Sequence, residues 1–184
     1  QEGKPLRWDA GDPLPMVAHI GSRSDISDGD QASAILHNLQ KWNKASENRM
    51  TFMFWSGKNT EYYPPNSDMN GTSSLYFASR HSNGKAPVDS NIIGMTQVWY
   101  EASSGKILEA DIVLNDNDFQ FSKSPGDTSG PGNGEGGGKK VYLESVLAHE
   151  MGHAFGLSHS GVQNSSMFFM EAPDQYRLSC DDQT

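Results

Sequence analysis

Two histidines on one predicted helix, His149 and His153, constrain this chain more than any other feature of its sequence. The stretch around them has apolar residues at helical spacing, and Gly156 is suited to end the helix. Residues four apart lie on one side of a helix, one turn above the other, so both imidazoles can share an ion. The apolar residues that predict this helix are Leu143, Val146, Leu147, Ala154 and Phe155.

The residues next to this pair complete a predicted site for a metal ion. Glu150 follows His149 directly, so its carboxylate points about 100° away around the helix. There it can reach a water molecule on the metal without being a ligand, which is the geometry of a general base. Gly156 can adopt a positive φ, which lets the chain reverse and bring His159 back as a third ligand. Three histidines leave a fourth position open for water.

The sequence HEMGHAFGLSH at 149–159 matches H-E-x-x-H-x-x-G-x-x-H at every defined position, so it resembles the zinc motif of the metzincin peptidases. The later stretch NSSMFF resembles the Met-containing turn of that superfamily, with Met167 in the place of its methionine. Ser160 follows the third histidine as in matrixins, where astacins have Glu, serralysins Pro and adamalysins Asp. Phe169 stands where astacins and serralysins place a zinc-binding Tyr, which supports the matrixin-like branch.

More distant stretches also resemble matrixins and imply the fold. ILHNLQKWNKASENRMTFMF is similar to the first helix and following strand, LEADIVLN to the strand before the active-site helix, and YRLSCDDQT to the opening of the last helix. The resemblance implies an α+β, zincin-like catalytic domain with a mixed, mostly parallel twisted sheet of about five strands. We expect one domain over 1–184, with subdomains at 1–157 and 158–184, the second ending before the family's last helix is complete.

The hydrophobic pattern predicts the elements before the histidine segment. A helix is expected over 29–48, with His37 off its apolar stripe. A stretch rich in glycine at 125–138 predicts a surface loop inside the domain. The residues of the apolar stripe are Ala32, Ile35, Leu36, Leu39 and Trp42. Strands are expected at 13–20, 50–56, 74–79, 93–101 and 107–114.

Composition excludes several classes of partner. The 184 residues include 14 Lys and Arg against 23 Asp and Glu, and the resulting net charge of −9 repels phosphate backbones and anionic headgroups. We therefore expect no nucleic-acid partner. The longest dense apolar stretch, residues 50–55, is far short of the roughly 20 residues that span a bilayer. With a single cysteine, Cys180, the chain cannot form an internal disulfide.

Animal matrixins carry a second, structural zinc, and this sequence departs from that pattern. Only His81 lies in the corresponding region, and the strand positions near Gln97 and Val113 are not histidine, so we expect a single zinc. Acidic residues around the strand at 107–114 are candidate calcium ligands, but they lack EF-hand spacing, and the pattern favours a solvated strand end. These candidate ligands are Glu109, Asp111, Asn115, Asp116, Asn117 and Asp118.

The resemblance implies a zinc-dependent endopeptidase. His149, His153 and His159 would hold one catalytic zinc, and Glu150 would activate the zinc-bound water that attacks a peptide bond. A protein or peptide substrate would lie antiparallel to the edge strand at 93–101. The residues expected to contact the substrate are Gln97, Val98, Phe168 and Phe169, and those expected to shape the site are Gly156 and Met167.

The sequence leaves two other functions open. One is a zinc hydrolase of the same fold that acts on cell-wall peptides. The other is a binding module that keeps zinc for stability without turnover, and the intact Glu150 argues against it. A broadly active peptidase would damage a cytoplasm, so we expect a secreted monomer whose signal or pro-segment has been removed. The lack of disulfides favours a bacterial source over an animal one.

Overall fold

A computed structural model of the chain describes residues 3–9, 13–21, 26–46, 51–57, 69–80, 88–128, 139–170 and 174–183. Its strands are β1 (Pro13–His19), β2 (Thr51–Gly57), β3 (Ser73–Phe77), β4 (Gly94–Tyr100), β5 (Ile107–Leu114), β6 (Phe119–Ser122) and β7 (Lys139–Tyr142). Its helices are α1 (Asp28–Ala45) and α2 (Leu143–Ala154), with short 3-10 turns at η1 (Ala78–Arg80) and η2 (Asp181–Gln183).

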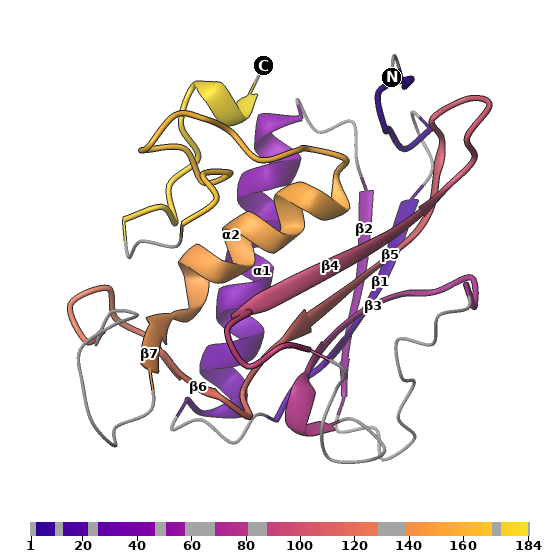
Figure 1. Ribbon diagram of the computed structural model, residues 1–184. Coiled ribbons are helices and arrows are strands. Elements are labelled where there is room, and N and C mark those ends of the chain that lie inside the picture. The colour runs from indigo at the N-terminus through magenta and orange to yellow at the C-terminus, as the bar shows by residue number, and fades with distance from the viewer. Residues whose placement is uncertain are drawn as a thin grey trace.

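Five strands form one sheet in the order β2-β1-β3-β5-β4, and α1 and α2 pack on one of its faces (Figure 1). The β1–β2, β1–β3 and β3–β5 pairs are parallel, whereas β4 runs antiparallel to β5 at the edge. This arrangement confirms the expected α+β fold with a mixed, mostly parallel sheet. Among the described residues, no helix combines the length and apolar character that crossing a membrane requires.

The predicted elements are present, each within three residues of its expected ends. Two short strands, β6 and β7, pair in parallel as a separate ribbon and were not predicted. Each has four residues, too few to show an alternating pattern. Of the predicted Gly-rich loop at 125–138, only residues 125–128 are described. Residues 129–138 and His81 lie outside the described residues, so the expectations for them remain predictions.

Helix α1 begins at its N-cap Ser27, whose hydroxyl accepts from the Asp30 N–H at 3.2 Å. Its buried face is narrower than the predicted stripe, because Leu36 is 41% exposed and only its neighbour Ile35 enters the core. Successive residues point about 100° apart on a helix, so one of the two had to face away from the sheet. Asn38 lies on the buried face of α1, where its side-chain amide donates to the Ala34 carbonyl at 3.0 Å.

The acidic residues of β5 are buried, so the predicted solvated strand end is wrong. Glu109 accepts hydrogen bonds from the main-chain N–H groups of Asn70 and Gly71, and Asp111 accepts one from Ser74 at 2.8 Å. Asp116, just after the strand, accepts from the Ser79 N–H in the same way. Main-chain donors replace water here, which is the condition for burying a carboxylate. Calcium at these oxygens is the second alternative that the sequence raises, and these contacts do not test it.

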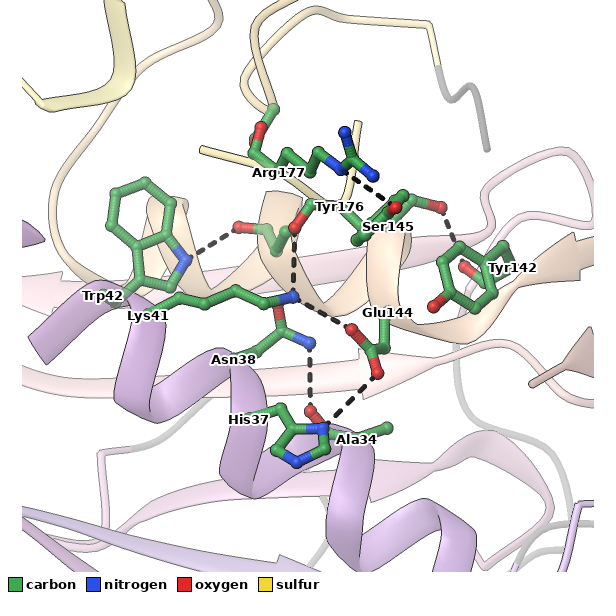
Figure 2. A network of polar contacts seen from close by, with 12 residues as sticks. Ala34, His37, Asn38, Lys41, Trp42, Tyr142, Glu144, Ser145, Tyr176 and Arg177 are labelled. Carbon is green, nitrogen blue, oxygen red and sulfur yellow. Dashed lines mark hydrogen bonds and ion pairs between the residues drawn. The ribbon is translucent and has the colours of Figure 1, made fainter. Parts of the chain in front are cut away.

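Two side chains of α1 connect it to α2 and to the C-terminal segment (Figure 2). The Lys41 ammonium lies 2.9 Å from a Glu144 carboxylate oxygen and donates to the Tyr176 carbonyl at 3.0 Å. The Trp42 indole N–H donates to the Ala148 carbonyl at 3.1 Å. These contacts fix the helix that carries His149 and His153 against the first helix of the chain.

The N-terminal segment 3–9, hereafter the N-terminal strap, lies beside the β4–β5 hairpin (Figure 1). Arg7 pairs with the hairpin, since its N–H donates to the Gly105 carbonyl at 3.0 Å and its carbonyl accepts from the Ile107 N–H at 2.8 Å. The Trp8 indole N–H donates to the Ala154 carbonyl at 2.9 Å. The strap therefore joins the edge of the sheet to the last turn of α2.

We predict that Lys41→Met lowers the free energy of unfolding by about 1 kcal/mol, because Glu144 and the Tyr176 carbonyl lose a partly buried cation. Urea unfolding monitored by circular dichroism measures this change. Lys123→Met is the matched control, because the Lys123 side chain is 71% exposed, against 30% for Lys41, and lies 3.4 Å from Asp30. Equal losses in the two variants would contradict the prediction.

We also predict that the free energy of unfolding falls as pH rises, because Asp111 titrates at different pH in the folded and unfolded chain. Burial raises the pKa of Asp111 to about 7, so the folded chain keeps a proton that the unfolded chain releases near pH 4. The free energy of unfolding should therefore decrease between about pH 4 and 7, by at most about 1.4 kcal/mol per pH unit from this group. Asp111→Asn should flatten this dependence in urea titrations, and an unchanged slope would contradict the assignment.

Candidate metal centre

Three imidazoles converge at the end of α2. His149 and His153 are one turn apart on the helix, and His159 follows it. The separations between their Nε2 atoms are 3.1 Å for His149–His153 and 3.2 Å for each pair that includes His159. Two nitrogens bound to one tetrahedral zinc at about 2.05 Å would lie about 3.3 Å apart. The three nitrogens thus have the spacing of a zinc ligand set.

The protonation of two of these rings follows from their other nitrogen. His149 Nδ1 lies 2.7 Å from the Ser166 carbonyl, and His153 Nδ1 lies 2.8 Å from the Leu157 carbonyl. A carbonyl only accepts, so each Nδ1 carries the proton and each Nε2 presents a lone pair. Burial lowers the pKa of His149 to about 4 and also lowers that of His153, so both rings are neutral at pH 7. Converging lone pairs on neutral imidazoles fit a cation.

The third histidine is positioned by the way α2 ends. Gly156 has φ +94°, and its N–H donates to the His153 carbonyl at 2.9 Å. The Leu157 N–H donates to the Gly152 carbonyl at 3.0 Å, so the helix closes in a Schellman motif. This turn reverses the chain, as the sequence predicted, and brings His159 back toward α2. A Cβ atom at position 156 would lie 2.7 Å from the Leu6 carbonyl oxygen of the N-terminal strap.

The segment after His159 forms a turn at residues 165–167 that contacts His149 and α2. Met167 is buried, and its carbonyl accepts from the Ser160 N–H at 2.7 Å. Its sulfur packs against α2 where Gly152 has no side chain, since a Cβ there would lie 2.2 Å from Sδ. Ser166 in the same turn supplies the carbonyl that orients His149. The turn therefore holds His149 in place and packs against α2 at Gly152.

A buried carboxylate that sequence reasoning missed holds this turn. Asp182 accepts hydrogen bonds from the Ser165 hydroxyl and from the main-chain N–H groups of Ser166 and Met167. It also accepts from both the N–H and the hydroxyl of Ser179. Burial alone would raise the pKa of Asp182, but these donors lower it below its usual value. No local pattern marks Asp182, because its partners in the turn lie 15 to 17 residues away.

Glu150 lies beside the three histidines in one hollow of about 430 Å³. Its side chain is 5% exposed and packs against β4, where the Thr96 hydroxyl donates to Oε2 at 2.6 Å. Burial raises the pKa of Glu150 to about 7, and the hydrogen bond from Thr96 opposes this rise. Sequence reasoning missed Thr96 and Gly94, although strand alternation places both on one face of β4.

The four residues expected to contact a substrate are distributed around this hollow. Phe169 is 63% exposed and lines it together with the three histidines. Val98 lines a second hollow, of about 360 Å³, on the side of His153 and His159 that faces the N-terminal strap. Gln97 lines neither hollow, because strand alternation turns its side chain to the other face of β4. Phe168 is half-buried and packs on Phe169, with ring centroids 4.5 Å apart.

We predict that Gly156→Ala lowers the free energy of unfolding by about 1–3 kcal/mol, because a side chain at this φ is strained and meets the Leu6 carbonyl. Its zinc affinity should fall as well. Gly161→Ala is the matched control, since nothing lies within 4 Å of a Cβ there, and it should change stability by less than about 0.5 kcal/mol. Denaturant unfolding and zinc titration measure both effects, and equal behaviour of the two variants would contradict the prediction.

One family comparison covers nearly the whole chain. The model of the matrixin family, Peptidase_M10, matches residues 18–184, which include both helices, the three histidines and the sheet apart from residues 13–17 of β1. Among curated proteins, none matches the chain. A match of this length agrees with the resemblance found in the zinc motif. The chain therefore belongs to the matrixin family, whose members are zinc-dependent metallopeptidases.

Proposed function

We propose that this chain is a zinc-dependent endopeptidase in which His149, His153 and His159 hold one zinc ion and Glu150 is the general base. The observation that carries the proposal is the set of three Nε2 atoms 3.1–3.2 Å apart, with the Glu150 carboxylate in the same hollow. A bound zinc supplies a Lewis acid that polarises the peptide carbonyl and lowers the pKa of water. Gly156 and Met167 shape the ligand set as described above.

Glu150 is suited to move a proton in both directions. With its pKa raised to about 7, the carboxylate can take a proton from the attacking water near neutral pH. It can then give that proton to the leaving amine, so one side chain serves as base and acid in turn. The chain needs no serine or cysteine nucleophile for this reaction.

The sheet offers a place for the substrate. Strand β4 is at the edge of the sheet, paired on one side with β5, and its residues run along both hollows. An extended peptide antiparallel to β4 would add a strand through main-chain hydrogen bonds. Val98 and Phe169 would then flank it on the two sides of the histidines, while Gln97 and Phe168 would contribute main-chain groups. The apolar ring of Phe169 favours an apolar substrate side chain.

The proposal includes a single catalytic domain that acts as a monomer. It also places the chain outside the cytoplasm, where cleavage of unfolded protein does no damage to the producing cell. Casein is therefore a suitable first substrate. A cross-linked cell-wall peptide is the second substrate to test, because hydrolysis of that peptide alone would identify the narrower hydrolase.

We predict that the wild-type chain cleaves casein, that a zinc chelator stops the reaction, and that added zinc restores it. Glu150→Ala should retain zinc and lose at least about a hundredfold in kcat, because general-base catalysis contributes about 10²–10⁴-fold. His153→Ala should lose zinc as well as activity. Casein cleavage assays and metal analysis of the purified proteins give these values.

His37→Ala is the matched control for loss of a histidine, because His37 lies exposed on α1 beside Glu144 and away from the ligand set. It should keep one zinc per chain. Zinc content unchanged by His153→Ala would overturn the ligand assignment. A fully active Glu150→Ala variant would overturn the role of the carboxylate, and zinc bound without cleavage of either substrate would identify a non-catalytic module.

A further inference from the structure

Two residues of the edge strand, Gly94 and Thr96, meet Glu150 of α2. They are two apart in β4, so they share one face of the strand. Both also line the hollow that holds the three histidines. The side chain of Glu150 is thus enclosed between its own helix and two positions of a strand more than fifty residues earlier in the chain.

Gly94 provides the room that this arrangement needs. A Cβ atom at position 94 would lie 2.7 Å from Oε1, 2.8 Å from Cγ and 2.9 Å from Cδ of Glu150. Real Cβ atoms essentially never come so close to another heavy atom. Any side chain there would displace the carboxylate, so glycine is required by close approach and not by an unusual backbone angle.

Thr96 provides the one hydrogen bond that orients the carboxylate. Its hydroxyl oxygen is 2.6 Å from Oε2 of Glu150 and 3.0 Å from the main-chain carbonyl oxygen of Glu150. A hydroxyl has one proton to donate. The carboxylate oxygen is the stronger acceptor and lies closer, so it receives this hydrogen bond. Within the part of the chain that the structure describes, no other group donates a hydrogen bond to this carboxylate.

We propose that Thr96 is a positioning residue for Glu150, with Gly94 as the space that lets the carboxylate reach it. The inference rests on the proposed role of Glu150 as the general base. A glutamate side chain has three rotatable bonds, and a buried one with a single donor has one orientation that is best satisfied. The Thr96 hydroxyl selects that orientation, which keeps the carboxylate in the hollow beside the histidines and leaves Oε1 without a hydrogen-bond donor.

A purely structural role for Thr96 makes different predictions, because its second contact ties β4 to the main chain of α2. Thr96→Ser keeps the hydroxyl and removes a methyl group, whereas Thr96→Val keeps the shape and removes the hydroxyl. We expect Thr96→Val to lower kcat by about ten- to a hundredfold with KM changed less than about twofold. Thr96→Ser should stay within about threefold of wild type, and Gly94→Ala should behave like Thr96→Val.

Zinc content should remain one per chain in all of these variants, because neither position supplies a ligand. Ser145→Ala is the control for loss of a buried hydroxyl, since Ser145 lies in the first turn of α2 and donates to the Tyr142 carbonyl at 2.8 Å, five residues before Glu150. It should keep the wild-type kcat. The proposal is overturned if Thr96→Val has the wild-type kcat, or if the Ser and Val variants lose activity equally.

A double-mutant cycle on the zinc-free protein tests the same hydrogen bond without any enzyme assay. Thr96→Val should lower the melting temperature in the Glu150 background and lower it much less when combined with Glu150→Ala. Additive shifts would show that the hydroxyl and the carboxylate are not coupled, and would overturn the proposal. A wild-type chain that cleaves no substrate would overturn the endopeptidase function, while the cycle would still decide whether Thr96 holds Glu150.

Discussion

The arrangement of this molecule depends on three imidazole Nε2 atoms that face one place. The two helix rings, His149 and His153, gain nothing from facing each other, so the protein must orient them with hydrogen bonds made elsewhere. It does so with two main-chain carbonyls, Ser166 for His149 and Leu157 for His153. One carbonyl comes from the turn at 165–167 and the other from the reversal after α2. Every feature that fixes these two carbonyls therefore also fixes the orientation of these two rings, however far from them it lies in the sequence.

The N-terminal strap contacts both the β4–β5 hairpin and the turn that follows α2. The N-terminal strap runs over two glycines with positive φ, Gly105 in the β4–β5 hairpin and Gly156 after α2. At each of them a Cβ atom would meet a strap carbonyl, that of Pro5 at 2.4 Å or that of Leu6 at 2.7 Å. The strap thus fits both places only because neither has a side chain. The strap adds a second link between the β4–β5 hairpin and the helix that carries the histidines, besides the direct contact of Thr96 with Glu150.

The local half of the site can be predicted from the sequence, because the three histidines, Glu150 and Gly156 lie within eleven residues. Helix periodicity and one reversing glycine fix their relative positions there. Thr96 could not be assigned in this way, since it meets Glu150 across 54 positions and only the packing of strand on helix brings them together. Asp111 was misjudged for the same reason: a carboxylate on a strand indicates solvent unless a distant main-chain N–H, here that of Ser74, satisfies it.

Three buried carboxyl groups, Asp182, Glu150 and Asp111, differ in how many hydrogen-bond donors surround them. Asp182 accepts from several hydroxyl and N–H groups, which lower its pKa and keep it charged and fixed. Glu150 and Asp111 are as deeply placed but have few donors, and burial raises the pKa of each to about 7. A carboxylate saturated with donors would have little affinity for a proton. With a single donor, from Thr96, Glu150 has one oxygen held by a hydrogen bond and one oxygen left for proton exchange, which is what the proposed general base requires.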